Sequence, residues 1–180
     1  AASGGCSTQT SGRTMKQIIV AMAVVLFSAR ATAMPANVVT ARGIGSVAFG
    51  MTVSQFSRSV GETLSPPPDP ADQACFYLEA KIFPGVAFMF EDGRLRRIDV
   101  RTNTIRTTAG VTLGTSSSEV KRRYKSRITD EPHHYSGPED RYLTAPLNAA
   151  FAVRFETSGS KVDSFYVGYK AQVQYVEGCL

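Results

Sequence analysis

The chain has 180 residues, 43% of them hydrophobic, which is enough for one domain with a buried core. Its formal net charge is +5, and basic residues cluster in segments 94–106 and 121–127. Acidic residues are interspersed, as on an ordinary solvated surface, so we expect no nucleic-acid partner.

The N-terminal region predicts export. Met15-Lys16, the apolar run 18–27 and Ala31-Thr32-Ala33 form the three zones of a signal peptide, 15–33. Ten apolar residues are too few to span a bilayer, so we expect cleavage after Ala33 and a mature chain without a transmembrane span. Residues 1–14 are small, polar and patternless, and we interpret them as a non-native or misassigned extension. The predicted location is periplasmic or secreted.

Two cysteines, Cys75 and Cys179, remain after cleavage. An even number in an oxidising compartment predicts a disulfide between them. A metal or redox site is not expected, because the chain has no Cys-x-x-Cys motif. Lipidation at Cys6 is not expected either, because no apolar export segment precedes it.

An internal repeat organises the remaining sequence. Segment 47–56 recurs as 111–120, and each copy leads from an apolar pair through a glycine to a capping box, Thr52 with Gln55 and Ser116 with Glu119. Short amphipathic helices should follow. Their predicted buried residues are Phe56 and Val60 in the first helix and Val120 and Tyr124 in the second.

Strands are predicted by alternation. The apolar sets are Val86/Phe88/Phe90 and Phe151/Val153/Phe155, and turns are expected at Asp92-Gly93 and at 157–160, with a last strand over 171–176. The predicted fold class is α+β, with two tandem helix-plus-antiparallel-strand repeats and helices packed on one face of the sheet. Their predicted bounds are 43–108 and 109–180.

The opening Phe49-Gly50-Met51-Thr52, with Gly61 ending the helix, resembles the Gly-Met-Thr opening of the SmpA/OmlA-type (BamE-like) outer-membrane assembly lipoproteins. Repeated in tandem, the pattern also resembles the β-lactamase inhibitory protein. The lipoproteins, however, have a single unit and an acylated cysteine. The resemblance implies a non-enzymatic exported protein whose sheet face or loops grip another macromolecule.

The candidate binding residues are those that alternation places opposite the helix-facing set, together with two tyrosines flanking the second loop. Aromatic, arginine and methionine side chains of this kind are enriched at protein interfaces. An ordinary solvated sheet face and a glycan site built by tyrosine stacking remain alternatives. The set comprises Met89, Arg97, Arg101, Tyr135, Tyr142, Arg154 and Tyr166.

Catalysis would have to use His133 or His134, the histidines of the chain, and no Gly-x-Ser-x-Gly motif accompanies them. We expect a binding or inhibitory module for an envelope protein, with no cofactor, no metal and no enzymatic activity. The alternatives are a small cell-wall or lipid hydrolase using His133/His134 and a structural envelope component.

Overall fold

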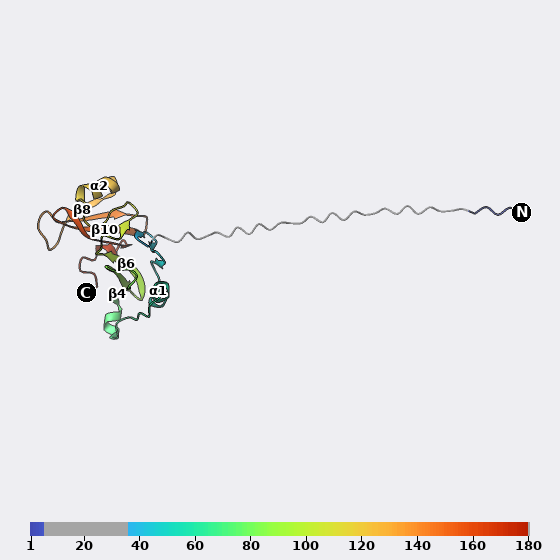
Figure 1. Cartoon of the computed structure of the whole chain (residues 1–180), viewed down its shortest axis with the longest axis horizontal. Helices are drawn as coiled ribbons and strands as arrows, with labels where there is room; N and C mark the ends of the chain where they lie inside the picture. The colour runs from blue at the N-terminus through green and yellow to red at the C-terminus, as the bar shows by residue number, and fades with distance from the viewer. Residues whose placement is uncertain (6–35, 180) are drawn as a thin grey trace. The chain divides into compact units, whose positions relative to one another are not determined.

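The computed structural model describes residues 1–5 and 36–179 (Figure 1). Contacts divide the chain into two units, 1–31 and 32–180, and the second unit contains all the elements discussed below. The predicted leader, 15–33, and Cys6 lie outside the described residues.

A seven-stranded antiparallel sheet dominates the second unit. Its strand order is β4-β5-β6-β11-β10-β9-β8. The pair β6–β11 joins the earlier strands to the later ones. The bounds are β4 (Cys75–Glu79), β5 (Val86–Glu91), β6 (Arg94–Val100), β8 (Thr129–Pro132), β9 (Arg141–Pro146), β10 (Phe151–Ser158) and β11 (Lys161–Tyr169).

A smaller sheet, which the sequence did not predict, has four short strands in the order β3-β2-β1-β7. They are β1 (Val38–Thr40), β2 (Gly43–Ile44), β3 (Val47–Ala48) and β7 (Arg106–Thr107). The pair β1–β7 is parallel and joins segments more than sixty residues apart in the chain. Strands of two or three residues are too short to show an alternating pattern.

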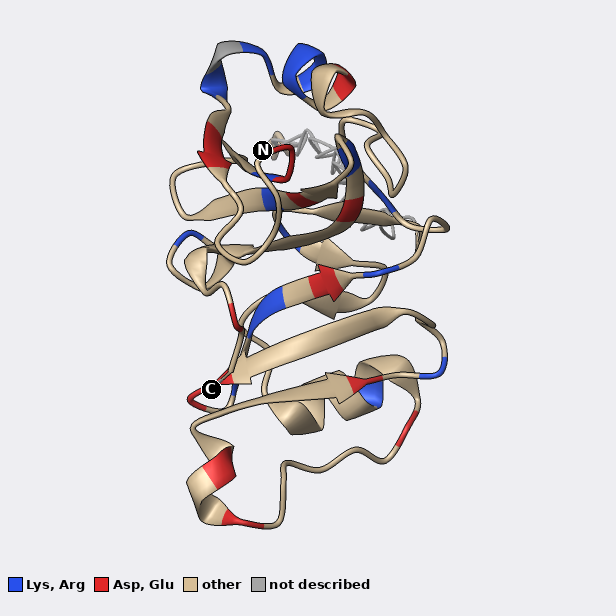
Figure 2. Cartoon of the chain, turned by 90° about the vertical axis from the view of Figure 1, so that its left-hand side faces the viewer, with Lys and Arg blue, Asp and Glu red and all other residues tan. Residues whose placement is uncertain are grey.

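The helices are short. The α-helices are α1 (Val53–Val60) and α2 (Ser117–Tyr124), and the 3₁₀ helices are η1 (Pro70–Gln73), η2 (Lys125–Arg127) and η3 (Gln172–Gln174). The last turn of α2 carries three basic residues, Lys121, Arg122 and Arg123, and the helix is coloured largely blue at the top of Figure 2. Each α-helix buries the two residues expected from its sequence.

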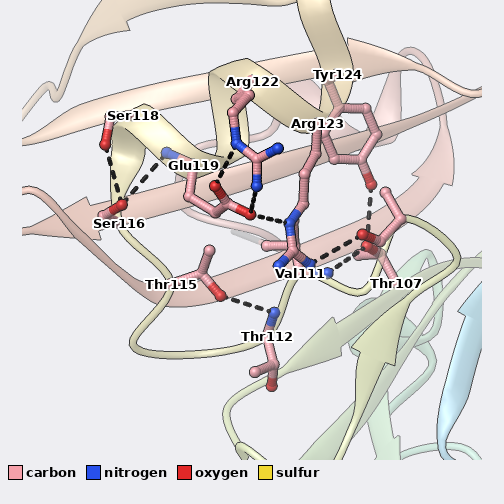
Figure 3. A network of polar contacts seen from close by, with 11 residues as sticks. Thr107, Val111, Thr112, Thr115, Ser116, Ser118, Glu119, Arg122, Arg123 and Tyr124 are labelled. Atoms are coloured by element: carbon pink, nitrogen blue, oxygen red, sulfur yellow. Dashed lines mark hydrogen bonds and ion pairs between the residues drawn. The ribbon is translucent and has the colours of Figure 1, made fainter.

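The two predicted capping boxes differ. The Thr52 side chain accepts from the Gln55 backbone N–H, and the Gln55 side chain accepts from the Thr52 backbone N–H, so the first box is complete. Ser116 likewise accepts from the Glu119 N–H. The Glu119 carboxylate, however, accepts from Arg122 and Arg123 instead of completing the box (Figure 3). The second prediction is therefore only half confirmed.

The predicted fold class, α+β with two tandem helix-plus-sheet repeats and helices packed on one face, is wrong. The described residues form eleven strands in two sheets and two α-helices of eight residues each, so the protein is mostly β. The two helices contribute four buried residues between them, whereas the strands supply most of the core. The sequence pattern gave the helices too much weight because their caps are its clearest local signals.

The core lies on one face of the large sheet. Phe88, Phe90, Val153 and Phe155 are fully buried, and the Phe56 ring of α1 lies 4.7 Å from the Phe88 ring. The turn at Asp92-Gly93 has positive φ at both residues, as a type I′ turn requires. The predicted last strand over 171–176 is wrong, because η3 begins at Gln172 and Val173 is buried against the sheet instead of extending it.

A covered polar face on the seven-stranded sheet

The face opposite the core carries two rows of polar and aromatic side chains. Register places Tyr77, Met89 and Arg97 side by side across β4, β5 and β6. A second row crosses from Asp99 through Tyr166, Arg154 and Thr144. Residues paired across antiparallel strands share a face, so segments distant in the sequence meet here.

The C-terminal segment, 171–179, crosses this face. Arg97 Nη1 donates to the carbonyl oxygens of Gln172, at 2.9 Å, and Tyr175, at 2.7 Å. The Tyr175 hydroxyl donates to Glu91 on β5. Most residues of the two rows are therefore buried beneath the protein's own chain end.

A disulfide holds the far end of this segment. Cys179 is bonded to Cys75 at the start of β4, as predicted, and this bond holds the end of the segment beside β4. Just before it, Gly178 has φ +72°, and a Cβ there would lie 2.5 Å from the Tyr77 hydroxyl. Close contact with Tyr77 therefore requires glycine at this position.

A buried ion pair lies at the centre of the covered face. Arg97 Nε and Nη2 donate to the two carboxylate oxygens of Asp99, at 2.8 and 2.9 Å, and Tyr77 also donates to Asp99. The Arg97 guanidinium stacks over the Tyr166 ring, with its Cζ 4.4 Å from the ring centroid. Burial raises the pKa of the Asp99 carboxyl, and the guanidinium opposes that shift.

Two tyrosines of this face are hard to ionise. Burial, reinforced by the Asp99 charge, raises the pKa of Tyr77 to about 12. Burial, reinforced by the Glu156 charge, also raises the pKa of Tyr166, whose hydroxyl donates to Glu156 at 3.0 Å. At neutral pH both phenols are therefore hydrogen-bond donors.

A cavity of about 340 Å³ lies between the sheet and the C-terminal segment. Its wall includes the Arg97–Asp99 pair and the Tyr166 ring. Other lining groups are charged, and the exposed Arg101 lies among them. The charged lining residues are Glu79, Arg97, Asp99, Arg101, Glu156 and Glu177, and the C-terminal segment contributes Val176, Glu177 and Gly178.

A second hollow, of about 450 Å³, lies near the connection between β8 and β9. Arg154 lines it together with Glu131, His133, His134 and Gln174, and Val176 lines both hollows. The Arg154 guanidinium stacks over the Tyr142 ring at 4.0 Å, and the His133 ring stacks on Tyr142 at 4.3 Å.

The seven predicted binding residues do not all line one site. Arg97, Arg101 and Tyr166 line the first cavity, Arg154 lines the second hollow, and Tyr142 stacks against the Arg154 guanidinium. Met89 is fully buried and cannot contact a partner. Tyr135 is 70% exposed and donates to Glu177. Alternation thus predicted which residues share a face, but not that the face is covered.

Several residues of the site were missed as binding candidates: Tyr77, Asp99, Glu156 and the C-terminal segment. Asp99 had a usable signal, because it lies two residues after Arg97 on a predicted strand and so shares its face. The predicted disulfide could have indicated that the C-terminal segment covers this face, because it ties the end of the chain to β4.

The alternative catalytic residues form no evident catalytic group. The His133 ring nitrogen accepts from the Tyr135 backbone N–H, and within the described part of the chain no hydrogen bond joins either histidine side chain to a serine or a carboxylate. The described residues contain no cluster of three or more His, Cys, Asp or Glu side chains that could hold a metal. None of their helices is long and apolar enough to cross a membrane.

The chain has little similarity to known proteins. The chain matches no known family profile, and no curated protein matches it. The crystal structure of the uncharacterized protein yfeY from Escherichia coli is similar over 73% of this chain and 99% of its own, with a TM-score of 0.46 and 14% identity. A likeness at this level supports no functional statement. The resemblance to the β-lactamase inhibitory protein and the SmpA/OmlA type stays a prediction.

Proposed function

We propose that the chain is an exported, non-enzymatic binding module that recognises a protein of the cell envelope by accepting a basic side chain of the partner in the 340 Å³ cavity. The observation that carries the proposal is a charge imbalance. Arg97 and Asp99 neutralise each other, which leaves the carboxylates of Glu79, Glu156 and Glu177 facing the single guanidinium of Arg101.

The arrangement of Glu156 supports this ligand class. Its carboxylate accepts from the hydroxyls of Ser164 and Tyr166, which orient it, and it forms no ion pair within 4.0 Å with any described residue. An oriented carboxylate beside an aromatic ring is suited to a lysine or arginine side chain.

The surroundings favour a protein partner over a free metabolite. Tyr135, which donates to Glu177, and Tyr175, which belongs to the C-terminal segment and donates to Glu91, are both exposed. They lie close in the chain or by contact to the wall residues Val176, Glu177 and Gly178. Exposed tyrosines around a pocket are typical of protein interfaces. Three alternatives compete with protein binding: binding of a glycan, a structural role in the envelope, and hydrolysis by His133 or His134.

Photo-crosslinking tests the proposal. A benzoyl-phenylalanine replaces Tyr175 in one sample and Ile82, which is exposed on the β4–β5 connection, in the control sample. We expect a single envelope protein to crosslink at position 175 and not at 82, and Glu156→Gln added to the 175 probe to reduce its yield at least tenfold. Equal yields from both positions, or no effect of Glu156→Gln in a protein of unchanged melting temperature, would overturn it.

A further inference from the structure

The second hollow contains a buried guanidinium whose hydrogen bonds are incomplete. Arg154 has a side chain only 3% exposed, and its Nη1 donates to Gln174 Oε1. Its Nε is buried without an acceptor among the described residues. Its Nη2 lies 3.6 Å from Glu131 Oε2, beyond hydrogen-bonding distance.

The open atoms lie on one edge of the guanidinium. Nε and Nη2 point in parallel and form the fork that binds the two oxygens of a carboxylate. A buried donor left unpaired is destabilising, because it has lost its hydrogen bonds to water without replacing them. The same fork of Arg97 is filled by Asp99, which shows how this face satisfies an arginine when a carboxylate is supplied.

A second unpaired group lies beside the first. Thr144 on β9 is directly opposite Arg154 on β10, and its buried Oγ1 has no hydrogen-bond partner among the described residues. Thr144 does not itself line the hollow, so its hydroxyl is placed to donate only to an anion oxygen held against the Arg154 guanidinium. His133 and His134 in the wall of the hollow add further N–H donors.

We propose that this hollow is an anion site in which Arg154 binds a planar carboxylate of a small molecule or a chain terminus through Nε and Nη2, with Thr144 as an additional donor. The site adjoins the proposed partner cavity, which takes a cationic group, and shares only Val176 with it. Glu131, whose side chain is 49% exposed, lies beside the fork and weakens anion binding through charge repulsion until it moves aside.

The experiment follows the Nε–H resonance of Arg154 by nitrogen-15 NMR in the full disulfide-bonded chain, with acetate, inorganic phosphate and chloride titrated at constant ionic strength. We expect saturable binding of acetate at least about tenfold tighter than of chloride. Arg96 provides an internal reference. Its Nε is also buried and unpaired, but Arg96 lines neither the 340 Å³ cavity nor the second hollow. Its resonance should not respond.

Variants make the result specific. Arg154→Lys retains the charge and loses the fork, and should weaken acetate binding at least about tenfold. Thr144→Val keeps the side-chain shape and should weaken binding severalfold, whereas Glu131→Gln should strengthen it. Arg141→Lys, at an arginine already paired with Asp130, should have no effect. Acetate binding no tighter than chloride, phosphate binding tighter than acetate, or full affinity in Arg154→Lys would overturn the proposal.

Discussion

Arg97 and Asp99 are two residues apart on β6 and form a two-bond ion pair whose side chains are 3% and 8% exposed. Alternation along a strand places residues i and i+2 on the same face, which lets such neighbours pair. The same guanidinium then holds the backbone of the C-terminal segment through Gln172 and Tyr175. This one pair therefore links the large sheet to its cover.

Breaking that pair should destabilise the protein strongly. Asp99→Asn leaves the Arg97 charge buried and uncompensated, so we expect the free energy of unfolding to fall by about 3–5 kcal/mol. Urea denaturation measures it. The double variant Arg97→Leu with Asp99→Leu removes both charges, so its free energy of unfolding should fall by less than that of Asp99→Asn alone. A larger fall would mean that the hydrogen bonds from Arg97 to the carbonyl oxygens stabilise the protein more than the balance of the two charges does.

Stability should fall at alkaline pH. The pKa of Tyr77 is about 12 in the folded protein and near 10 when unfolded, so the unfolded state loses its phenolic proton first. The stabilising contribution is complete below pH 10 and is lost as pH rises towards 12. Unfolding measured between pH 9 and pH 11.5 should show a steeper decline for the natural chain than for Tyr77→Phe. Parallel curves of stability against pH for the two proteins would contradict the raised pKa of Tyr77.

The disulfide should contribute substantially to stability. It closes a loop of 104 residues, and a loop of about 100 is worth up to about 4.7 kcal/mol in the chain-entropy model. Replacing both Cys75 and Cys179 by serine should lower the free energy of unfolding by a comparable amount. Hydrogen exchange should quicken at 176–179 more than at Gln172, because Arg97 still binds the Gln172 carbonyl. Uniform acceleration would argue against a separately anchored chain end.

The junction of β6 and β11 should tolerate no side chain at Gly168. A Cβ there would lie 2.4 Å from the Arg96 carbonyl oxygen and 2.9 Å from the Arg97 Cα. Because both neighbours are backbone atoms, Gly168→Ala must separate the strands, and we expect a lower melting temperature. Gly137→Ala is the matched control, since a Cβ at Gly137 meets nothing within 4 Å. Equal melting temperatures for the two variants would refute this expectation.

The Thr52 cap should stabilise α1. Thr52→Ala removes a complete capping box and should cost about 0.5–2 kcal/mol of stability. Ser54→Ala, at an exposed position in the first turn of the same helix, should be neutral or slightly stabilising because alanine favours helices. Chemical denaturation of both variants compares them. A larger loss at Ser54 than at Thr52 would show that the cap is not the stabilising feature.

Local features of this protein could be predicted from its sequence. The N-caps Thr52 and Ser116, the buried helix residues, the Asp92-Gly93 turn and the disulfide partners depend on residues near each other in the chain or on a simple count of cysteines. Alternation also placed Met89, Arg97, Arg154 and Tyr166 on one face of the sheet.

Only the tertiary structure decided the architecture and the accessibility of the site. The joining of β6 to β11, the parallel pair β1–β7 and the path of 171–179 across the polar face depend on contacts between residues far apart in sequence. Periodicity shows which side of a strand a residue occupies. It does not show what covers that side, because a covering segment is held by distant partners that leave no mark on the local pattern.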